Sequence, residues 1–195
     1  MKLLTTFFFV ILFSLIANAQ HNSESFSNKG RSTITVGYGI GNVWVYFLKH
    51  NSFFIDYVPN YTVKSMGPIT GCYENFILKK ISVGLAVSYS NVKGKGDSRG
   101  FFVDDQISIF TALIRGNYHF GKFPKFDPYV GGGIGYIRSA YKSYPSVSGP
   151  VPGDFGYSAQ IGAHYYITKQ TGVYGELGYV NGSFMQIGIN VDVFK

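Results

Sequence analysis

Apolar and polar residues alternate with a period of two along most of the chain, most clearly in its C-terminal forty residues. Between Phe155 and Ile167 the odd-numbered positions are apolar, whereas the even-numbered positions are mostly small or polar. The same alternation returns at 172–179 and, after Asn181-Gly182, at 185–193. Successive side chains of a β-strand point to opposite faces, so the pattern predicts three consecutive strands.

The composition of the two faces indicates which one points outward. The polar face holds Gly, Ser, Gln, His, Glu, Asn and Asp with few large charged side chains, a poor composition for a surface in water. The other face is aliphatic and aromatic, almost uninterrupted by Lys or Glu. An apolar outside around a small polar inside is typical of a transmembrane β-barrel. A soluble lipocalin-like barrel would require the opposite arrangement.

The whole chain divides into eight such segments. We expect strands at 32–41, 67–78, 81–90, 107–120, 128–141, 155–167, 172–179 and 185–193. Their connections alternate between short turns at 79–80, 121–126 and 168–170 and long loops at 42–65, 91–106 and 142–154. In outer-membrane barrels the short turns are periplasmic and the long loops extracellular. The sequence therefore predicts an all-β fold, an eight-stranded antiparallel up-and-down transmembrane β-barrel closed by pairing the first strand with the last.

The first 31 residues have no such alternation. Lys2, an apolar run at 3–16 and the small residues of Ala17-Asn18-Ala19 are typical of a secretory signal peptide cleaved after residue 19. The apolar run is shorter than the ~20 residues that span a bilayer. We expect a signal peptide at 1–19, a polar periplasmic lead-in at 20–31 and a barrel domain at 32–195. The expected location is the outer membrane.

Composition and charge exclude several other functions. The net charge of +7 is dispersed, with no basic run longer than Lys79-Lys80, so nucleic-acid binding is not predicted. The single Cys72 cannot form an internal disulfide. Gly131, Gly133 and Gly135 lie within a strand with no helix after it, so they do not form a nucleotide loop. We interpret them as space for larger interior side chains such as Tyr166 and Tyr174, and we expect neither a cofactor nor a metal.

Several chemically versatile side chains share the interior parity. We predict a structural polar network in the lumen formed by Glu74, Arg115, Asn117, Gln160, His164 and Glu176. Buried charges must be paired, and Arg115 can fork to one or both carboxylates. An eight-stranded barrel is just wide enough to be filled by its own side chains. A narrow pore for small solutes and a catalytic site are the alternatives.

An enzyme would need a nucleophile, a base and an acid within reach of each other. The likeliest bases, His119 and His164, lie toward the short-turn end of the barrel. Ser158 lies on the strand of His164 but six residues away, roughly 20 Å. The sequence alone supports no nucleophile–His–acid arrangement, so we predict no enzymatic activity and no catalytic residues. A lipid-modifying outer-membrane enzyme is the third alternative.

Four segments carry a resemblance to a known family: RGNYHF at 115–120, DPYVGGGIGY at 127–136, GELGY at 175–179, and the final strand. With them the chain resembles the small eight-stranded outer-membrane barrels of Gram-negative bacteria, the OmpA/OmpX-like outer membrane protein beta-barrel domain family in its Bacteroidetes form. The resemblance implies contact with outer-membrane lipid and insertion by the barrel-assembly machinery. Such barrels usually end in an aromatic residue, whereas here Phe194 is penultimate and Lys195 ends the sequence.

The predicted role is structural or one of surface interaction. The loops at 42–65, 91–106 and 142–154 would present residues to an unknown extracellular partner, and the aromatic 42–65 segment is the strongest candidate. No nucleic acid is expected among the partners.

Overall fold

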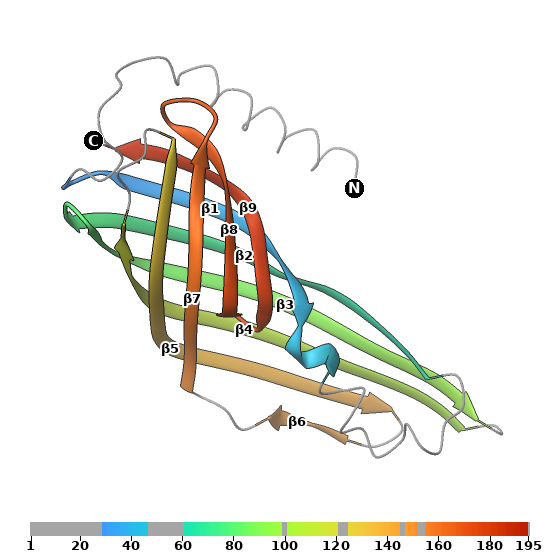
Figure 1. The fold of residues 1–195 in the computed structure, drawn as a ribbon. Helices are drawn as coiled ribbons and strands as arrows, with labels where there is room; N and C mark the ends of the chain where they lie inside the picture. The colour runs from blue at the N-terminus through green and yellow to red at the C-terminus, as the bar shows by residue number, and fades with distance from the viewer. Residues whose placement is uncertain are drawn as a thin grey trace.

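The computed structural model describes residues 29–46, 61–98, 101–120, 125–144, 147–151 and 155–194, and nearly all of them lie in strands (Figure 1). The strands are β1 Ser32–Asn42, β2 Thr62–Leu78, β3 Ile81–Ser98, β4 Phe101–His119, β5 Phe126–Tyr144, β6 Val147–Val151, β7 Phe155–Tyr166, β8 Thr171–Val180 and β9 Ser183–Phe194. No helix among these residues is long and apolar enough to cross a membrane.

Eight of the strands close into one antiparallel barrel. Neighbours along the chain pair in the order β1-β2-β3-β4-β5-β7-β8-β9, and β9 pairs back with β1 from Thr33↔Asp192 to Asn42↔Ser183. The short β6 pairs only with the end of β5. The predicted fold class and the closure of the first strand on the last are confirmed. The short connection at Asn181-Gly182 is a tight hairpin turn, in which both residues have positive φ.

The alternation of the two faces follows the prediction in the barrel wall. Along β7 the odd-numbered side chains are exposed and the even-numbered ones are mostly buried. From Phe120, just after β4, the exposed apolar positions continue along β4 in the barrel wall to Phe110. Ten residues at ~3.3 Å per residue and a tilt of ~40° give roughly 25 Å, the height of the apolar band of an outer-membrane barrel. Aromatic residues lie at both ends of this band, as at a bilayer interface.

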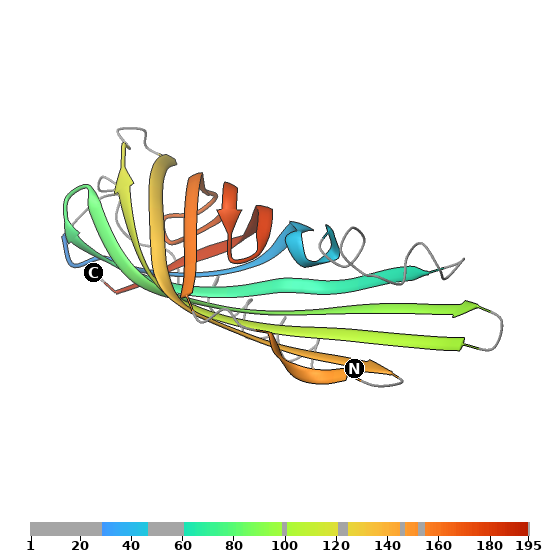
Figure 2. The same cartoon turned by 90° about the horizontal axis from the view of Figure 1, so that it is seen from below.

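The predicted loop at 91–106 is wrong. β3 and β4 continue through it to Ser98 and Phe101, and they stay paired over their whole length. β2 starts at Thr62, inside the predicted loop 42–65, and β5 and β6 take up much of 142–154. Figure 2 shows β3 and β4 running well beyond the C-terminal strands. Of the 42–65 segment, a helical turn at 43–46 is described and 47–60 lies outside the described residues.

We call this protruding sheet the extension; it comprises residues 62–66, 91–98, 101–108 and 140–144 together with β6. Its two faces have the opposite polarity from the barrel wall. Val92, Ile107 and Ile109 point inward, are buried, and form an apolar cluster with Trp44, Val45, Val63, Ile137 and Tyr141 packed against it. The outward neighbours on β4 become Ser108, Gln106 and Asp104, and Phe102 farther along the strand is the exposed apolar exception. An apolar inside with a polar outside is the arrangement of a sheet in water, so the extension stands outside the lipid.

Candidate functional site

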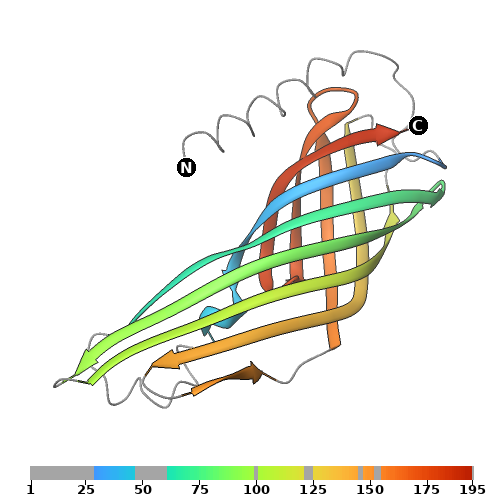
Figure 3. The ribbon, with the colours of Figure 1, turned by 180° about the vertical axis from the view of Figure 1, so that it is seen from behind.

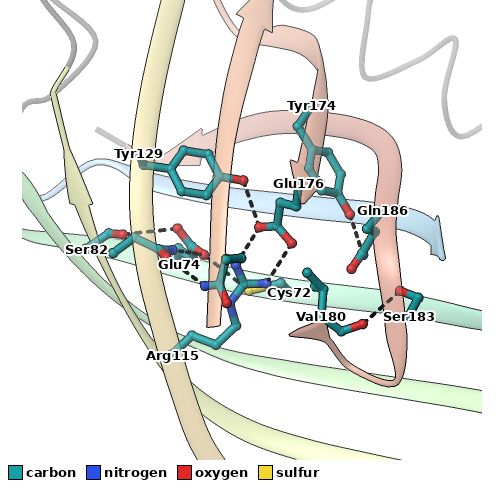
Figure 4. Close-up of polar contacts among 12 residues, drawn as sticks. Cys72, Glu74, Ser82, Arg115, Tyr129, Tyr174, Glu176, Val180, Ser183 and Gln186 are labelled. Carbon is teal, nitrogen blue, oxygen red and sulfur yellow. Dashed lines mark hydrogen bonds and ion pairs between the residues drawn. The ribbon is translucent and has the colours of Figure 1, made fainter. Parts of the chain in front are cut away.

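The lumen within the apolar band holds a network of buried polar side chains, drawn in Figure 4. Its centre is an ion pair between Arg115 on β4 and Glu176 on β8, with Nη2 and Oε1 2.5 Å apart and both side chains 2% exposed. The second guanidinium nitrogen lies 3.5 Å from Oε2, and the Tyr129 hydroxyl donates to Oε1 at 2.7 Å. The neighbouring strands β4 and β5 are thereby joined to β8 across the lumen.

Glu74 on β2 is satisfied by neutral donors. Asn117 Nδ2 donates to its carboxylate at 2.7 Å, and Ser82 Oγ donates at 3.1 Å. The Cys72 thiol adds a longer contact of 3.6 Å. Among the described ion pairs Arg115 engages Glu176 only, so the guanidinium does not fork to both carboxylates.

Gln160 lies between the two halves of this network, and its contacts depend on the orientation of its amide. One atom of its amide lies 3.0 Å from Asn117 Oδ1, which needs a donor, and 2.9 Å from Arg115 Nη2, which needs an acceptor. A hydrogen bond from a charged donor is the stronger of the two, so we assign the amide oxygen to this position. The amide nitrogen then donates to Ser158 Oγ at 3.2 Å.

The short-turn end of the lumen contains a second cluster, which sequence reasoning missed. Ser82 Oγ lies 3.0 Å from His119 Nε2, and His119 Nδ1 lies 2.9 Å from Asp127 Oδ2. His164 Nδ1 lies 3.9 Å from the same Asp127 oxygen, too far for a hydrogen bond. Ser82 therefore links the Glu74 half of the network to His119. Among the described residues, His164 has no hydrogen bond to this cluster, but its ring lies 4.9 Å from that of Tyr129, measured between centroids.

The Ser82–His119–Asp127 arrangement has the order and the distances of a serine hydrolase triad. Its environment does not suit catalysis, because each of the three residues is at most 1% exposed. Phe76 and Tyr129 pack against the His119 ring, with ring centroids 4.5 and 5.3 Å away. The Ser82 hydroxyl is also within reach of Glu74 as its donor. We assign these residues to the packing of the lumen.

A further ion pair ties the N-terminal lead-in to the last strand. Arg31 contacts the carboxylate of Asp192 and the hydroxyl of Tyr166, and Thr33 Oγ1 donates to Asp192 at 2.8 Å. The guanidinium also lies over the Tyr166 ring, 4.9 Å from its centroid. In the described part of the chain, no group of three His, Cys, Asp or Glu residues is placed to hold a metal ion.

The extension has a polar anchor of its own. The Asp105 side chain on β4 is fully buried and accepts hydrogen bonds from the hydroxyls of Tyr61 at 2.7 Å and Tyr141 at 2.9 Å. Burial, together with the hydrogen bond to Asp105 and the charge of that carboxylate, raises the pKa of Tyr61 above its ordinary value. This bond ties the start of β2 to β4.

The closed barrel, its apolar outer band and its polar interior define a membrane-spanning β-barrel. The sequence matches the family described as "Outer membrane protein beta-barrel domain" over residues 7–194, and the chain belongs to this family. It is a small outer-membrane β-barrel protein, of a kind that is generally non-enzymatic. No curated protein matches the sequence.

Solved structures share the fold at low sequence identity. The outer membrane protein W of E. coli is 14% identical with a TM-score of 0.51, covering 85% of this chain and 99% of that one. Ail, the attachment invasion locus protein of Yersinia pestis, is 10% identical with a TM-score of 0.46, covering 85% and 96%. The N-terminal barrel of Pseudomonas aeruginosa OprF is 18% identical with a TM-score of 0.38, covering 85% and 100%.

Proposed function

We propose that this outer-membrane barrel acts in surface interaction, with the extension as its contact surface. The observation that carries the proposal is the apolar cluster of Val92, Ile107 and Ile109 above the lipid-facing band. A segment that buries its own apolar core is held in one shape, whereas a solvated loop would have to be ordered on binding at an entropic cost. The extension therefore offers a preformed platform outside the membrane.

The lumen network has a structural role in this proposal. Its residues come from strands around the whole barrel, and the Arg115–Glu176 pair crosses the interior. Buried charges paired in this way fill the lumen and hold opposite walls together, which leaves a poor path for solutes. The filled lumen supports surface interaction over the narrow pore.

Among the described residues, one backbone edge of the extension has no strand partner. Residues 62–66 of β2 pair with β3 on one side, whereas the described pairs with β1 begin only at Ile69. A strand edge of this kind can accept an added strand from a partner. The extension thus offers two surfaces for contact: its outer face and the backbone edge of β2.

The first experiment separates the platform from the lumen. In one variant an Asn-Gly turn replaces residues 95–104 and joins the register partners Gly94 and Asp105, which shortens the hairpin but keeps the apolar cluster. Cells that make the shortened protein should lose aggregation and attachment to immobilised matrix proteins. The heat-modifiable gel shift should show that its barrel still assembles.

A parallel measurement tests the pore. The purified, folded protein in a planar bilayer should be electrically silent, and Glu74→Gln or Arg115→Ala should not create discrete channels. Channels in the wild-type protein that change with Arg115→Ala would move the function into the lumen. Unchanged attachment by the shortened variant would remove the extension from the proposal.

We propose the following route to the membrane. A signal peptide at 1–19 is cleaved, the lead-in of 20–31 lies in the periplasm, and the barrel-assembly machinery inserts 32–195 with the short turns on the periplasmic side. Mass spectrometry of the mature N-terminus tests the first step, with Gln20 expected. The terminal Lys195 lies outside the described residues; its effect on insertion is tested by deleting it so that Phe194 ends the chain.

A further inference from the structure

Four strands of the extension align a row of basic side chains on its outer face. The register places Lys64 of β2 opposite Lys93 of β3, Lys93 opposite Gln106 of β4, and Gln106 opposite Lys142 of β5. The three lysines are exposed. These strands lie side by side in Figure 3, so the row crosses four neighbouring strands. At a strand tilt of ~40°, each step of ~4.8 Å from one strand to the next changes the height in the membrane by roughly 3 Å. We call these three lysines the basic row.

Nothing in the fold accounts for this arrangement. Like charges directly opposite each other on neighbouring strands are destabilising. Among the described residues no carboxylate forms an ion pair with a lysine of the basic row. The nearest outward carboxylate, Asp104, is one row farther from the membrane and pairs with Lys95 at 2.9 Å. Within the described part of the chain, the basic row is therefore a positive surface on the lateral wall with no carboxylate paired to it.

Its height relative to the membrane indicates what it faces. Tyr89 and Phe110 are register partners at the upper end of the apolar band, and exposed Arg138 is opposite Phe110. Lys93 lies four residues beyond Tyr89, roughly 10 Å farther from the bilayer centre at a strand tilt of ~40°. The headgroup layer extends ~5–8 Å beyond the hydrocarbon on each side. Arg138 lies at the hydrocarbon side of the headgroup layer, and the basic row lies at its aqueous side. Long lysine side chains can bend toward the headgroups from there.

We infer that the basic row and Arg138 bind the phosphate groups of a phosphorylated glycolipid in the outer leaflet beside the β2–β5 wall. Phosphate accepts hydrogen bonds and salt bridges from ammonium and guanidinium groups, and lysines near an anionic membrane surface contribute additively. The lipid acyl chains would lie against the apolar band, with Tyr89 and Phe110 at the boundary between the acyl chains and the headgroups. This inference does not depend on the proposed function of the extension.

The test is native mass spectrometry of the full-length folded protein in detergent micelles that contain lipid A. Wild-type protein should retain phosphorylated lipid A in preference to the same lipid with its phosphates removed. The triple variant Lys64→Gln, Lys93→Gln and Lys142→Gln should bind phosphorylated lipid A roughly a hundredfold more weakly, since each lysine contributes roughly fivefold and the three factors multiply.

A matched triple variant controls for net charge. Lys79, Lys125 and Lys169 are exposed at the opposite, short-turn end, and their replacement by Gln should leave lipid A binding unchanged. Equal binding of the two lipid forms, or equal losses in both triple variants, would overturn the inference. Heparin and inorganic phosphate are added as soluble competitors. Wild-type protein that binds heparin through the basic row while ignoring lipid A would also overturn it, because the row would then serve a soluble polyanion.

Discussion

The Arg115–Glu176 pair is the most demanding interaction in the barrel, because two charges are held out of water. Each side chain is almost completely buried, and Tyr129 completes the hydrogen bonding of the carboxylate. Removing one partner of such a pair leaves the other charge buried and unpaired, which strongly destabilises the folded protein.

We expect Arg115→Met to lower the free energy of unfolding by about 3–5 kcal/mol. The double variant Arg115→Met and Glu176→Gln should recover part of that loss, because no charge then remains unpaired. Urea unfolding in micelles, followed by the gel shift, measures both. Lys95→Gln breaks the exposed pair with Asp104 and should cost less than ~1 kcal/mol. A double variant no more stable than Arg115→Met would contradict this account.

Tyr61 gives the extension a dependence on high pH. Its folded-state pKa is raised, so the neutral phenol is favoured in the folded protein. The stability from its bond to Asp105 is therefore present below the ordinary tyrosine pKa of ~10 and declines as the pH rises above it. Trp44, the only tryptophan in the chain, packs at the apolar cluster, and its emission should shift to the red as the bond is lost.

The control for this titration is Tyr61→Phe, which should weaken the extension by about 1 kcal/mol at neutral pH. In that variant the alkaline shift of Trp44 emission should be smaller than in the wild type. An identical alkaline transition in both proteins would assign it to other tyrosines.

Part of this residue-level chemistry was accessible from the sequence and part was not. Interior parity is a local property, so the buried positions of Glu74, Arg115 and Glu176 could be anticipated. The choice of Glu176 over Glu74 as the partner of Arg115, and the approach of Ser82 to His119, depend on the register between strands. The interior glycines show the same limit. A side chain at Gly131 would meet Asn117 and one at Gly133 would meet Arg115, rather than Tyr166 or Tyr174.

At the level of the strand, the extension shows that the same alternation of apolar and polar residues can place the apolar face either outward, in the lipid, or inward, beyond it. Residues 91–106 keep the period of two, but Val92 and Val103 lie on the inner face, and Phe102 is the exposed apolar exception. The prediction of a loop rests on the polar character of this segment. A strand that leaves the lipid is polar on its outer face, and this change occurs on β4 between Phe110 and Ser108.

Substitutions at adjacent positions of β4 test this inversion. Ile107→Asp places a charge in the apolar cluster and should unfold the extension, with a cost of about 3 kcal/mol or more. Gln106→Asp, on the outer face of the neighbouring position, should change stability by less than ~0.5 kcal/mol. Protease susceptibility of the extension and Trp44 emission report the difference. Equal resistance of the two variants would show that the cluster does not hold the extension together.

At the level of the whole molecule, closure depends on the seam between β1 and β9. Gly37 and Gly188 are register partners there, and a Cβ at Gly37 would collide with the Tyr174 hydroxyl, Gln186 and the backbone of Ile187. The missing side chains let these two strands approach the interior tyrosine closely.

We expect Gly37→Val to block closure and abolish the heat-modifiable gel shift. Gly71→Val provides the matched control, because a Cβ at Gly71 would make only an ordinary contact with Val87. Loss of the gel shift in both variants would point to a general effect of valine rather than to the seam.

The continuity of β3 and β4 from the barrel wall into the extension has a mechanical consequence. Every residue of β3 from Ile81 to Ser98 has a partner on β4, with no break where the strands leave the lipid. A pull on the tip of this hairpin draws β3 and β4 in the same direction, so it loads their hydrogen bonds to β2 and β5 in shear, many at a time. A flexible loop would pass the same force to its two attachment points. If a cell were held by this tip, the force would pass along continuous strands directly into the barrel wall.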